Sequence, residues 1–249
     1  MAFGIFDLTP LEWVHAVLIG LFVVTSMTLG LLIIARYFKY KKRVFLFVGL
    51  TWFGSVSTYW GYMFNIAHIF FLFDEIPVLW MLFFSTGTLA AVHVTWAIAF
   101  TDLVYQEKKK KFLLVIFVES LAYEITYFTL LAIDTSLIGT KAAQFFIVWS
   151  PFISIYIIAT VVLLIITGFL FTKESFKSDD EEVHLKGKFL VGAFITYGIG
   201  LVLELVCQEI PIEIAVYIIT ISRVLVIVAA FEFFFGFILP ERIKRIFIK

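Results

Sequence analysis

The stretch Trp13–Ala35, WVHAVLIGLFVVTSMTLGLLIIA, decides the class of fold. It contains no Lys, Arg, Asp or Glu, and about 20 apolar residues suffice for a helix to cross the hydrocarbon core of a bilayer. The segment that follows directly, Arg36–Arg43, reads RYFKYKKR and is strongly basic. Because basic segments stay on the cytoplasmic side of a membrane, the two stretches together predict a span whose C-terminal end reaches the cytoplasm.

The same alternation of apolar and polar stretches recurs along the whole chain. Hydrophobic residues make up 62% of the sequence and charged residues 15%, a ratio that would cover a soluble domain with apolar surface. We therefore expect an all-α, polytopic integral membrane protein of the cell (plasma) membrane, with a single seven-helix bundle over residues 1–249. No Lys or Arg precedes Arg36, so no cleaved signal peptide is expected. The expected spans are 13–35, 44–71, 78–103, 112–133, 145–171, 189–207 and 212–239.

The charges of the connecting segments predict the orientation. The first, third and fifth connections and the C-terminal tail are basic, whereas the opposite face carries only Lys141 among several acidic residues. The N-terminus should accordingly lie outside and the C-terminus in the cytoplasm. Residues 172–188 then form the largest cytoplasmic loop.

Ionisable side chains inside the spans predict a polar core, because such groups are costly in lipid and face the interior of a bundle. Arg223 and Glu124 lie about 11 and about 10 residues from the outer ends of their spans, and Glu204 about 5. We expect Arg223 to pair with Glu124, Glu204 or both. The pair would be either a structural contact that fixes helix packing or a switch that responds to a ligand or a proton.

Two further groups of polar residues have open interpretations. His93 and Glu119 reach a comparable depth and could share a proton; the alternative interpretation of His93 is a hydrogen-bonded packing residue. Ser55, Tyr59 and Tyr62 fall on one helix face and either line a pocket for an apolar ligand or serve packing. Pro151, within the predicted fifth span, should kink that helix.

Several classes of chemistry have no support in the sequence. Motifs of the H-E-x-x-H and G-x-S-x-G kinds and phosphate-binding glycine loops are absent, so we expect neither a catalytic site nor a metal. A retinal Schiff base needs a lysine in the last span, where the cation is Arg223. We expect no cofactor and no nucleic-acid partner.

The segment Gly236–Arg245, GFILPERIKR, lies where the last span leaves the membrane. Pro240 should end the helix, and the basic residues after it should hold an amphipathic segment at the anionic inner surface. The segment and the seven-span topology resemble the multi-helix membrane sensor regions that precede histidine kinase or GAF modules in prokaryotes. In that family the segment passes a signal to a covalently attached output module, whereas this sequence stops at Lys249. The resemblance implies a sensor whose output is a separate partner or a neighbouring subunit.

Three functions remain open at this point. The first is a receptor-like sensor that signals to a cytoplasmic protein or within a homo-oligomer. The second is a small transporter or proton-conducting bundle, and the third is a structural subunit of a membrane complex. A cytoplasmic partner would dock on the acidic run and the tail. The docking candidates are Asp179, Asp180, Glu181, Glu182, Arg242, Lys244 and Arg245.

Overall fold

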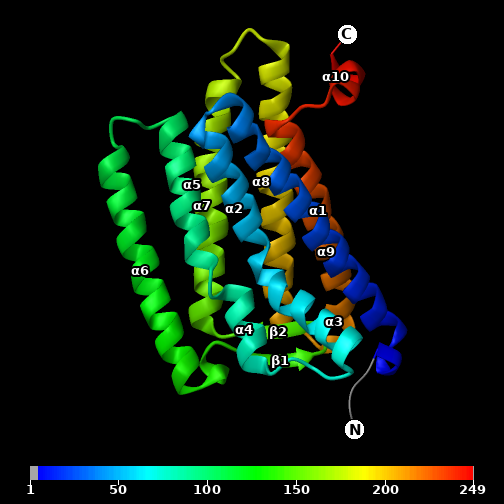
Figure 1. Ribbon diagram of the computed structural model, residues 1–249. Helices are drawn as coiled ribbons and strands as arrows, with labels where there is room; N and C mark the ends of the chain where they lie inside the picture. Colours follow the sequence, from blue (N-terminus) through cyan, green and yellow to red (C-terminus); the bar gives the residue numbers. More distant parts are fainter. Residues whose placement is uncertain (1–4, 249) are drawn as a thin grey trace.

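The computed structural model describes residues 5–248 as a bundle of long helices with one small antiparallel sheet at its end (Figure 1). The α-helices are α1 (Pro10–Tyr40), α2 (Arg43–Ser55), α3 (Trp60–Leu72), α4 (Val78–Thr86), α5 (Leu89–Leu103), α6 (Lys109–Ile133), α7 (Pro151–Ser175), α8 (Glu181–Val206), α9 (Ile212–Phe237) and α10 (Glu241–Phe247). The 3-10 turns are η1 (Ile5–Asp7), η2 (Val56–Tyr59), η3 (Thr135–Leu137) and η4 (Cys207–Glu209), and the strands are β1 (Gly139–Ala143) and β2 (Phe146–Trp149).

Six helical segments in the described part of the chain are long and apolar enough to cross a membrane. They are α1, α4 with α5, α6, α7, α8 with η4, and α9. The prediction of an α-helical, multi-pass membrane bundle is thereby confirmed. Helix α1 also shows how the sequence sets a boundary: Pro10 occupies its first turn, and Thr9 and Glu12 form a reciprocal capping box.

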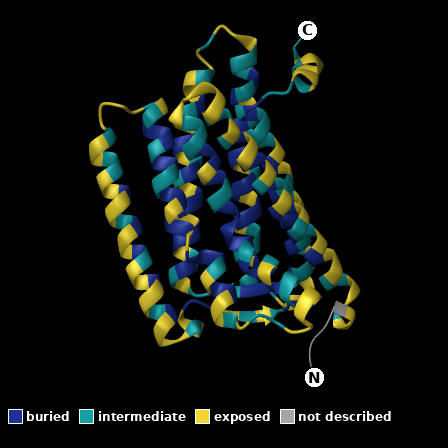
Figure 2. Ribbon diagram, viewed as in Figure 1, coloured by how far each residue is buried: buried dark blue, intermediate teal, exposed yellow. Residues whose placement is uncertain are grey.

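The helices pack in an order that differs from their order in the sequence. Helix α6 packs on α5, α5 on α2, α2 on α1, α1 on α9, α9 on α8 and α8 on α7. Figure 1 shows α6 at the edge of the bundle, and Figure 2 shows that it is mostly exposed while the middle of the bundle is buried. Large side chains such as Phe22, Tyr59 and Trp96 fill this interior.

The region predicted as the second span, 44–71, is a broken helix. Helices α2 and α3 are joined by η2, and the Ser55 hydroxyl donates to the carbonyl of Trp52 at the break, 2.8 Å away. Such bonds from serine to the preceding turn bend helices. Beyond the break, Gly61 passes so close to α4 that a Cβ there would overlap the carbonyl oxygen of Met81. The prediction of one uninterrupted helix is wrong.

The predicted fifth span, 145–171, also differs from the structure. Its first residues belong to a β-hairpin in which Gly139 pairs with Trp149, and the helix begins only at Pro151, in the first helical turn. Proline has no N–H to lose in that position, so it starts α7 instead of kinking it. The hairpin lies across the end of the bundle opposite to α10 (Figure 1).

The segment predicted as a long cytoplasmic loop, 172–188, is largely helical. Helix α7 continues to Ser175 and α8 begins at Glu181, which leaves residues 176–180 as the connection. The Asp180 carboxylate accepts a hydrogen bond from the backbone N–H of Glu182 and so caps α8. The acidic run is thus the N-terminus of a helix, where carboxylates favourably oppose the helix dipole.

Candidate functional site

Arg223 on α9 lies in the interior of the bundle, and 1% of its side chain is exposed. Its Nη2 donates to the carbonyl oxygen of Phe145, at the tip of the hairpin, over 2.6 Å. Its Nε lies 3.7 Å from Oε1 of Glu204 on α8, an ion pair too long to be a hydrogen bond. The guanidinium therefore connects the hairpin with the two helices α8 and α9.

Two tyrosines from the broken second helix complete the surroundings of this charge. The guanidinium carbon of Arg223 lies 5.9 Å from the ring centre of Tyr62, within the range of a cation–π contact. The Tyr62 hydroxyl accepts a hydrogen bond from the backbone N–H of Ile147 on β2, 3.1 Å away. Tyr59 packs edge-on against Tyr62, and its hydroxyl interacts electrostatically with Glu204. The hairpin is thus tied both to the arginine and to a tyrosine beside it.

Several polar atoms of this centre are buried without a hydrogen-bond partner among the described residues. They are Nε and Nη1 of Arg223, Oε1 of Glu204 and the hydroxyl oxygen of Tyr59. A cavity of about 20 Å³, room for one water molecule, lies beside Glu204 and Tyr62. The centre consequently has both donors and acceptors to spare, and it can take a proton, a water molecule or a small polar ligand. We call Arg223, Glu204, Tyr59, Tyr62 and the Phe145 carbonyl the polar centre.

Glu124 does not belong to the polar centre: the prediction that Arg223 pairs with Glu124, Glu204 or both is confirmed for Glu204. Glu124 lies on α6, which packs on α5 at the edge of the bundle, whereas α9 packs between α1 and α8. Oε2 of Glu124 has no hydrogen-bond partner within residues 5–248. Equal depth in the membrane did not bring the two residues together because their helices are not neighbours.

His93 and Glu119 are in contact, away from the polar centre. Nδ1 of His93 lies 3.1 Å from Oε2 of Glu119 and 3.2 Å from the hydroxyl of Tyr156, and its Nε2 lies 2.7 Å from Oγ1 of Thr160. The imidazole, which is buried and stacked on the Tyr156 ring, joins α5, α6 and α7. These contacts are those of a hydrogen-bonded packing residue; proton sharing with Glu119 stays a prediction.

Ser55, Tyr59 and Tyr62 are all buried, but the cavities beside them are small. The cavity next to Ser55 measures about 10 Å³, and the one next to Tyr62 is large enough for a single water molecule only. The Ser55 carbonyl accepts a hydrogen bond from the hydroxyl of Tyr197 on α8, 3.0 Å away. The structure puts two of these residues, the tyrosines, at the polar centre and the serine at the bend of the second helix, and a pocket for an apolar ligand stays a prediction.

Two contacts near the polar centre were not predicted from the sequence. The Phe145 carbonyl is a backbone group, so no residue type marks it as a partner for Arg223. His15 on α1 is buried, and its Nε2 lies 3.1 Å from the carbonyl oxygen of Val216 and 3.0 Å from Oγ1 of Thr220 on α9. The three-residue spacing puts Thr220 and Arg223 on one face of α9, but it does not indicate that α1 packs on that face.

The predicted docking residues lie at the opposite end of the bundle. Glu182, near the start of α8, accepts hydrogen bonds from Lys186 at 2.6 Å and from Lys244 on α10 at 2.5 Å. The bond to Glu182 raises the pKa of Lys244 above its usual value. Arg242 and Arg245 are exposed, as are the remaining acidic residues of the run, Asp179, Asp180 and Glu181.

No three histidine, cysteine or acidic side chains within residues 5–248 gather closely enough to hold a metal ion. Comparison of the chain with protein-family models, with curated proteins and with solved structures finds no match.

Proposed function

We propose that this chain is a receptor-like sensor of the cell membrane that detects a polar signal at the polar centre and reports it to a cytoplasmic signalling protein. One observation carries the proposal: helix α8 has a charged contact near each of its ends, with Arg223 in the middle of α9 and with Lys244 on α10. Glu204 meets Arg223 near the hairpin, and Glu182 meets Lys244 just beyond the far end of α9. About 33 Å of helix separates the two glutamates on α8.

The packing of α8 against α9 supports the transmission of a small movement between these contacts. Glycines let the two helices approach closely: the Ser222 hydroxyl donates to the carbonyl of Gly200 over 2.8 Å, and a Cβ on Gly236 would overlap the side chain of Leu190. Small residues at a membrane helix interface allow this kind of close contact. Helices packed this tightly move as rigid bodies, so a shift of one end displaces the other.

The hairpin supplies the element that a signal would act on. Arg223 has one hydrogen bond, to the Phe145 carbonyl, and a looser ion pair to Glu204. A proton on Glu204, or an anion at the unused nitrogens of Arg223, would change which partner the guanidinium prefers. A buried, partly satisfied polar network is energetically costly, so a proton or an anion that satisfies the unused groups would stabilise the rearranged centre.

For the topology we propose seven crossings, with the broken segment α2–η2–α3 as the second. In Figure 1 the chain runs back and forth along the bundle, and α10 and the basic connections lie at the end opposite to the hairpin. The positive-inside rule then puts the hairpin outside and α10 in the cytoplasm. Reporter fusions at Lys41 and at Glu75, the two ends of the segment α2–η2–α3, test the proposal. A reporter that is active only in the cytoplasm should work at Lys41, and one that is active only outside should work at Glu75. Fusions active on the same side would contradict seven crossings.

The central experiment measures whether a change at the polar centre moves the cytoplasmic end. In a Cys207→Ser background, cysteines at Lys188 and Ile246 carry spin labels, and their separation is measured by electron paramagnetic resonance in lipid nanodiscs. Glu204→Gln mimics the protonated carboxyl and should shift the distance distribution. The matched control, Glu119→Gln, neutralises a carboxylate on the distant helix α6 and should leave the distances unchanged.

The same variants separate sensing from transport. The cavities beside Ser55 and beside Glu204 are of water size, which favours a closed core over a conducting path. Proteoliposomes should therefore show no proton flux that depends on the protein. Flux that disappears in Glu204→Gln, with unchanged label distances, would support the transporter and defeat the sensor.

A further inference from the structure

A hollow of about 800 Å³ lies at the basic end of the bundle, apart from the polar centre. It is formed where the ends of α2, α5, α6, α7 and α9 come together. Its lining residues are Lys42, Arg43, Val44, Phe45, Asp102, Leu103, Gln106, Lys109, Phe171 and Phe237. The hollow is larger than the interior cavities and combines charged with aromatic side chains.

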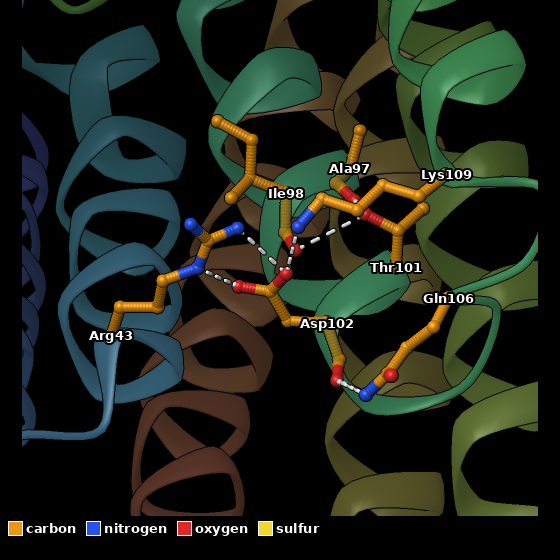
Figure 3. A network of polar contacts seen from close by, with 7 residues as sticks. All are labelled: Arg43, Ala97, Ile98, Thr101, Asp102, Gln106 and Lys109. Atoms are coloured by element: carbon orange, nitrogen blue, oxygen red, sulfur yellow. Dashed lines mark hydrogen bonds and ion pairs between the residues drawn. The ribbon is translucent and has the colours of Figure 1, made fainter.

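Asp102 organises the charged side of this hollow (Figure 3). Its carboxylate accepts hydrogen bonds from Nε and Nη2 of Arg43 and from Nζ of Lys109, the Nη2 bond being 2.8 Å long. The Gln106 side-chain amide donates a hydrogen bond to the backbone carbonyl of Asp102 over 3.1 Å, and this bond holds the turn after α5 in place. The two cations are thereby fixed on either side of one carboxylate, as Figure 3 shows.

The hollow retains a positive charge after this pairing. Its lining contains three cations, Lys42, Arg43 and Lys109, and one carboxylate, Asp102, so its net charge is +2. Arg43 is 55% exposed, and Lys42 is exposed at the N-cap of α2 without capping that helix through its side chain. Uncapped N–H groups at a helix N-terminus favour an anion, as do the remaining donors of the cations.

The other side of the hollow is apolar. Phe171 on α7 and Phe237 on α9 stack with their rings nearly parallel, at 4° and 6.1 Å between centres, and Leu103 is 39% exposed beside them. These residues lie at the ends of three spans, where hydrocarbon gives way to headgroups. A ligand that fits here has a negatively charged head and an apolar body. A phospholipid in a leaflet has the same arrangement, with its headgroup beside its acyl chains.

We propose that this hollow binds the phosphate headgroup of an anionic phospholipid, from the leaflet at the basic end, with an acyl chain along Phe171 and Phe237. Lys42, Nη1 of Arg43 and the remaining N–H groups of the Lys109 ammonium contact the phosphate, while Asp102 keeps Arg43 and Lys109 in position. This site is independent of the sensor proposal, because it uses none of the residues of the polar centre.

The test is retention of lipid during purification. The protein is incorporated into nanodiscs that contain equal amounts of phosphatidylglycerol and phosphatidylcholine with the same acyl chains, then extracted, and bound lipids are counted by native mass spectrometry. The wild type should retain phosphatidylglycerol selectively. Lys42→Gln/Arg43→Gln should lower this preference by about fivefold per charge removed. Asp102→Asn keeps one side-chain oxygen that accepts hydrogen bonds from the cations but removes the negative charge that competes with the phosphate, so it should raise the preference.

The matched control is Lys110→Gln/Lys111→Gln, which removes the same charge from the start of α6 without altering the lining of the hollow. Equal losses of selectivity in the two double variants would overturn the proposal in favour of general surface attraction. Displacement of phosphatidylglycerol by excess inorganic phosphate would likewise overturn it, because the site would then recognise a free anion. The opposite responses to Asp102→Asn and to Lys42→Gln/Arg43→Gln keep the test valid if one variant folds poorly.

Discussion

Arg223 and Arg43 are both paired with a carboxylate, but the buried arginine, Arg223, has fewer and longer contacts than the exposed one. Arg43 is 55% exposed at the edge of the bundle, and two of its nitrogens donate to Asp102, which is also bound by Lys109. Arg223 is 1% exposed, and it has a single hydrogen bond to a neutral carbonyl and an ion pair at 3.7 Å. Arg223, whose charge is the more deeply buried and so the more costly, therefore has the weaker hydrogen-bonding partners.

The difference distinguishes two uses of an ion pair. A pair that serves stability alone benefits from short, well-satisfied bonds, which is the arrangement around Asp102. The polar centre keeps unused donors on Arg223 and an unused acceptor on Glu204 at a position where both are buried. We interpret the first as a fixed contact between helix ends and the second as a contact that changes partners.

The largest effect is expected when Arg223 is replaced. Arg223→Met leaves the Glu204 carboxylate and the Phe145 carbonyl buried without their cation, and should reduce the free energy of unfolding by about 3–5 kcal/mol. Unfolding in mixed micelles titrated with dodecyl sulfate measures it. The double variant Arg223→Met/Glu204→Met should regain much of the loss, since no buried charge remains. A double variant whose loss equals the sum of both single losses would show that the two charges are not coupled.

Gly61→Ala should have the next largest effect and tests how closely α3 must approach α4. The added Cβ would overlap the Met81 carbonyl and displace α3 together with Tyr62, which should cost about 1–3 kcal/mol in the same unfolding assay. Gly20→Ala is the matched control, because a Cβ at Gly20 meets no atom within 4 Å. Equal stabilities for the two variants would contradict the close approach.

Asp102→Asn should have a smaller effect, although it breaks more hydrogen bonds than any change at Arg223. Arg43 and Lys109 remain solvated when the carboxylate is lost, so the expected cost is about 1 kcal/mol, and salt should diminish it. Glu174→Gln, which breaks an exposed pair with Lys177, is the control and should be nearly neutral. A loss at Asp102 as large as that at Arg223 would refute the contrast between the two regions.

Lys244→Gln should leave stability unchanged and release α10. A spin label at Ile246 should become more mobile, whereas Arg245→Gln, an exposed neighbour, should not change its mobility. In the wild type the Glu182 contact raises the pKa of Lys244, so the contact that holds α10 is complete below the usual lysine pKa of about 10.4 and is lost as the pH rises through the higher folded-state value. Label mobility that is independent of pH in this range would contradict the contact.

Long apolar runs with basic ends were enough to predict a helical membrane bundle, because length and hydrophobicity act within one segment. The wrong predictions concern segments whose composition suits two kinds of local structure equally well. Residues 145–150 are as apolar as the helix that follows, so they were predicted to belong to it. Pro151 was predicted to kink the helix, whereas it is the first residue of α7. The acidic run looked like a solvated loop because helix caps use the same residue types as loops.

The polar centre was predicted only in part for a related reason. Depth along a helix can be counted from the sequence, but it matched Arg223 with Glu124 and put Glu204, the residue that pairs with Arg223, nearer the outer face. Which helices are neighbours depends on the packing of the whole bundle, so Glu124 was included wrongly. The Phe145 carbonyl was missed because every residue has one.

The bond between Arg223 and the hairpin has a consequence for how the protein is made. Ribosomes release the chain from its N-terminus, so Tyr62, Phe145 and Glu204 are all synthesised before Arg223. The helix that brings the most costly charge into the membrane is thus the last of the long helices to arrive. When it does, the acceptors for that charge are already in place, and the arginine need never cross the lipid alone.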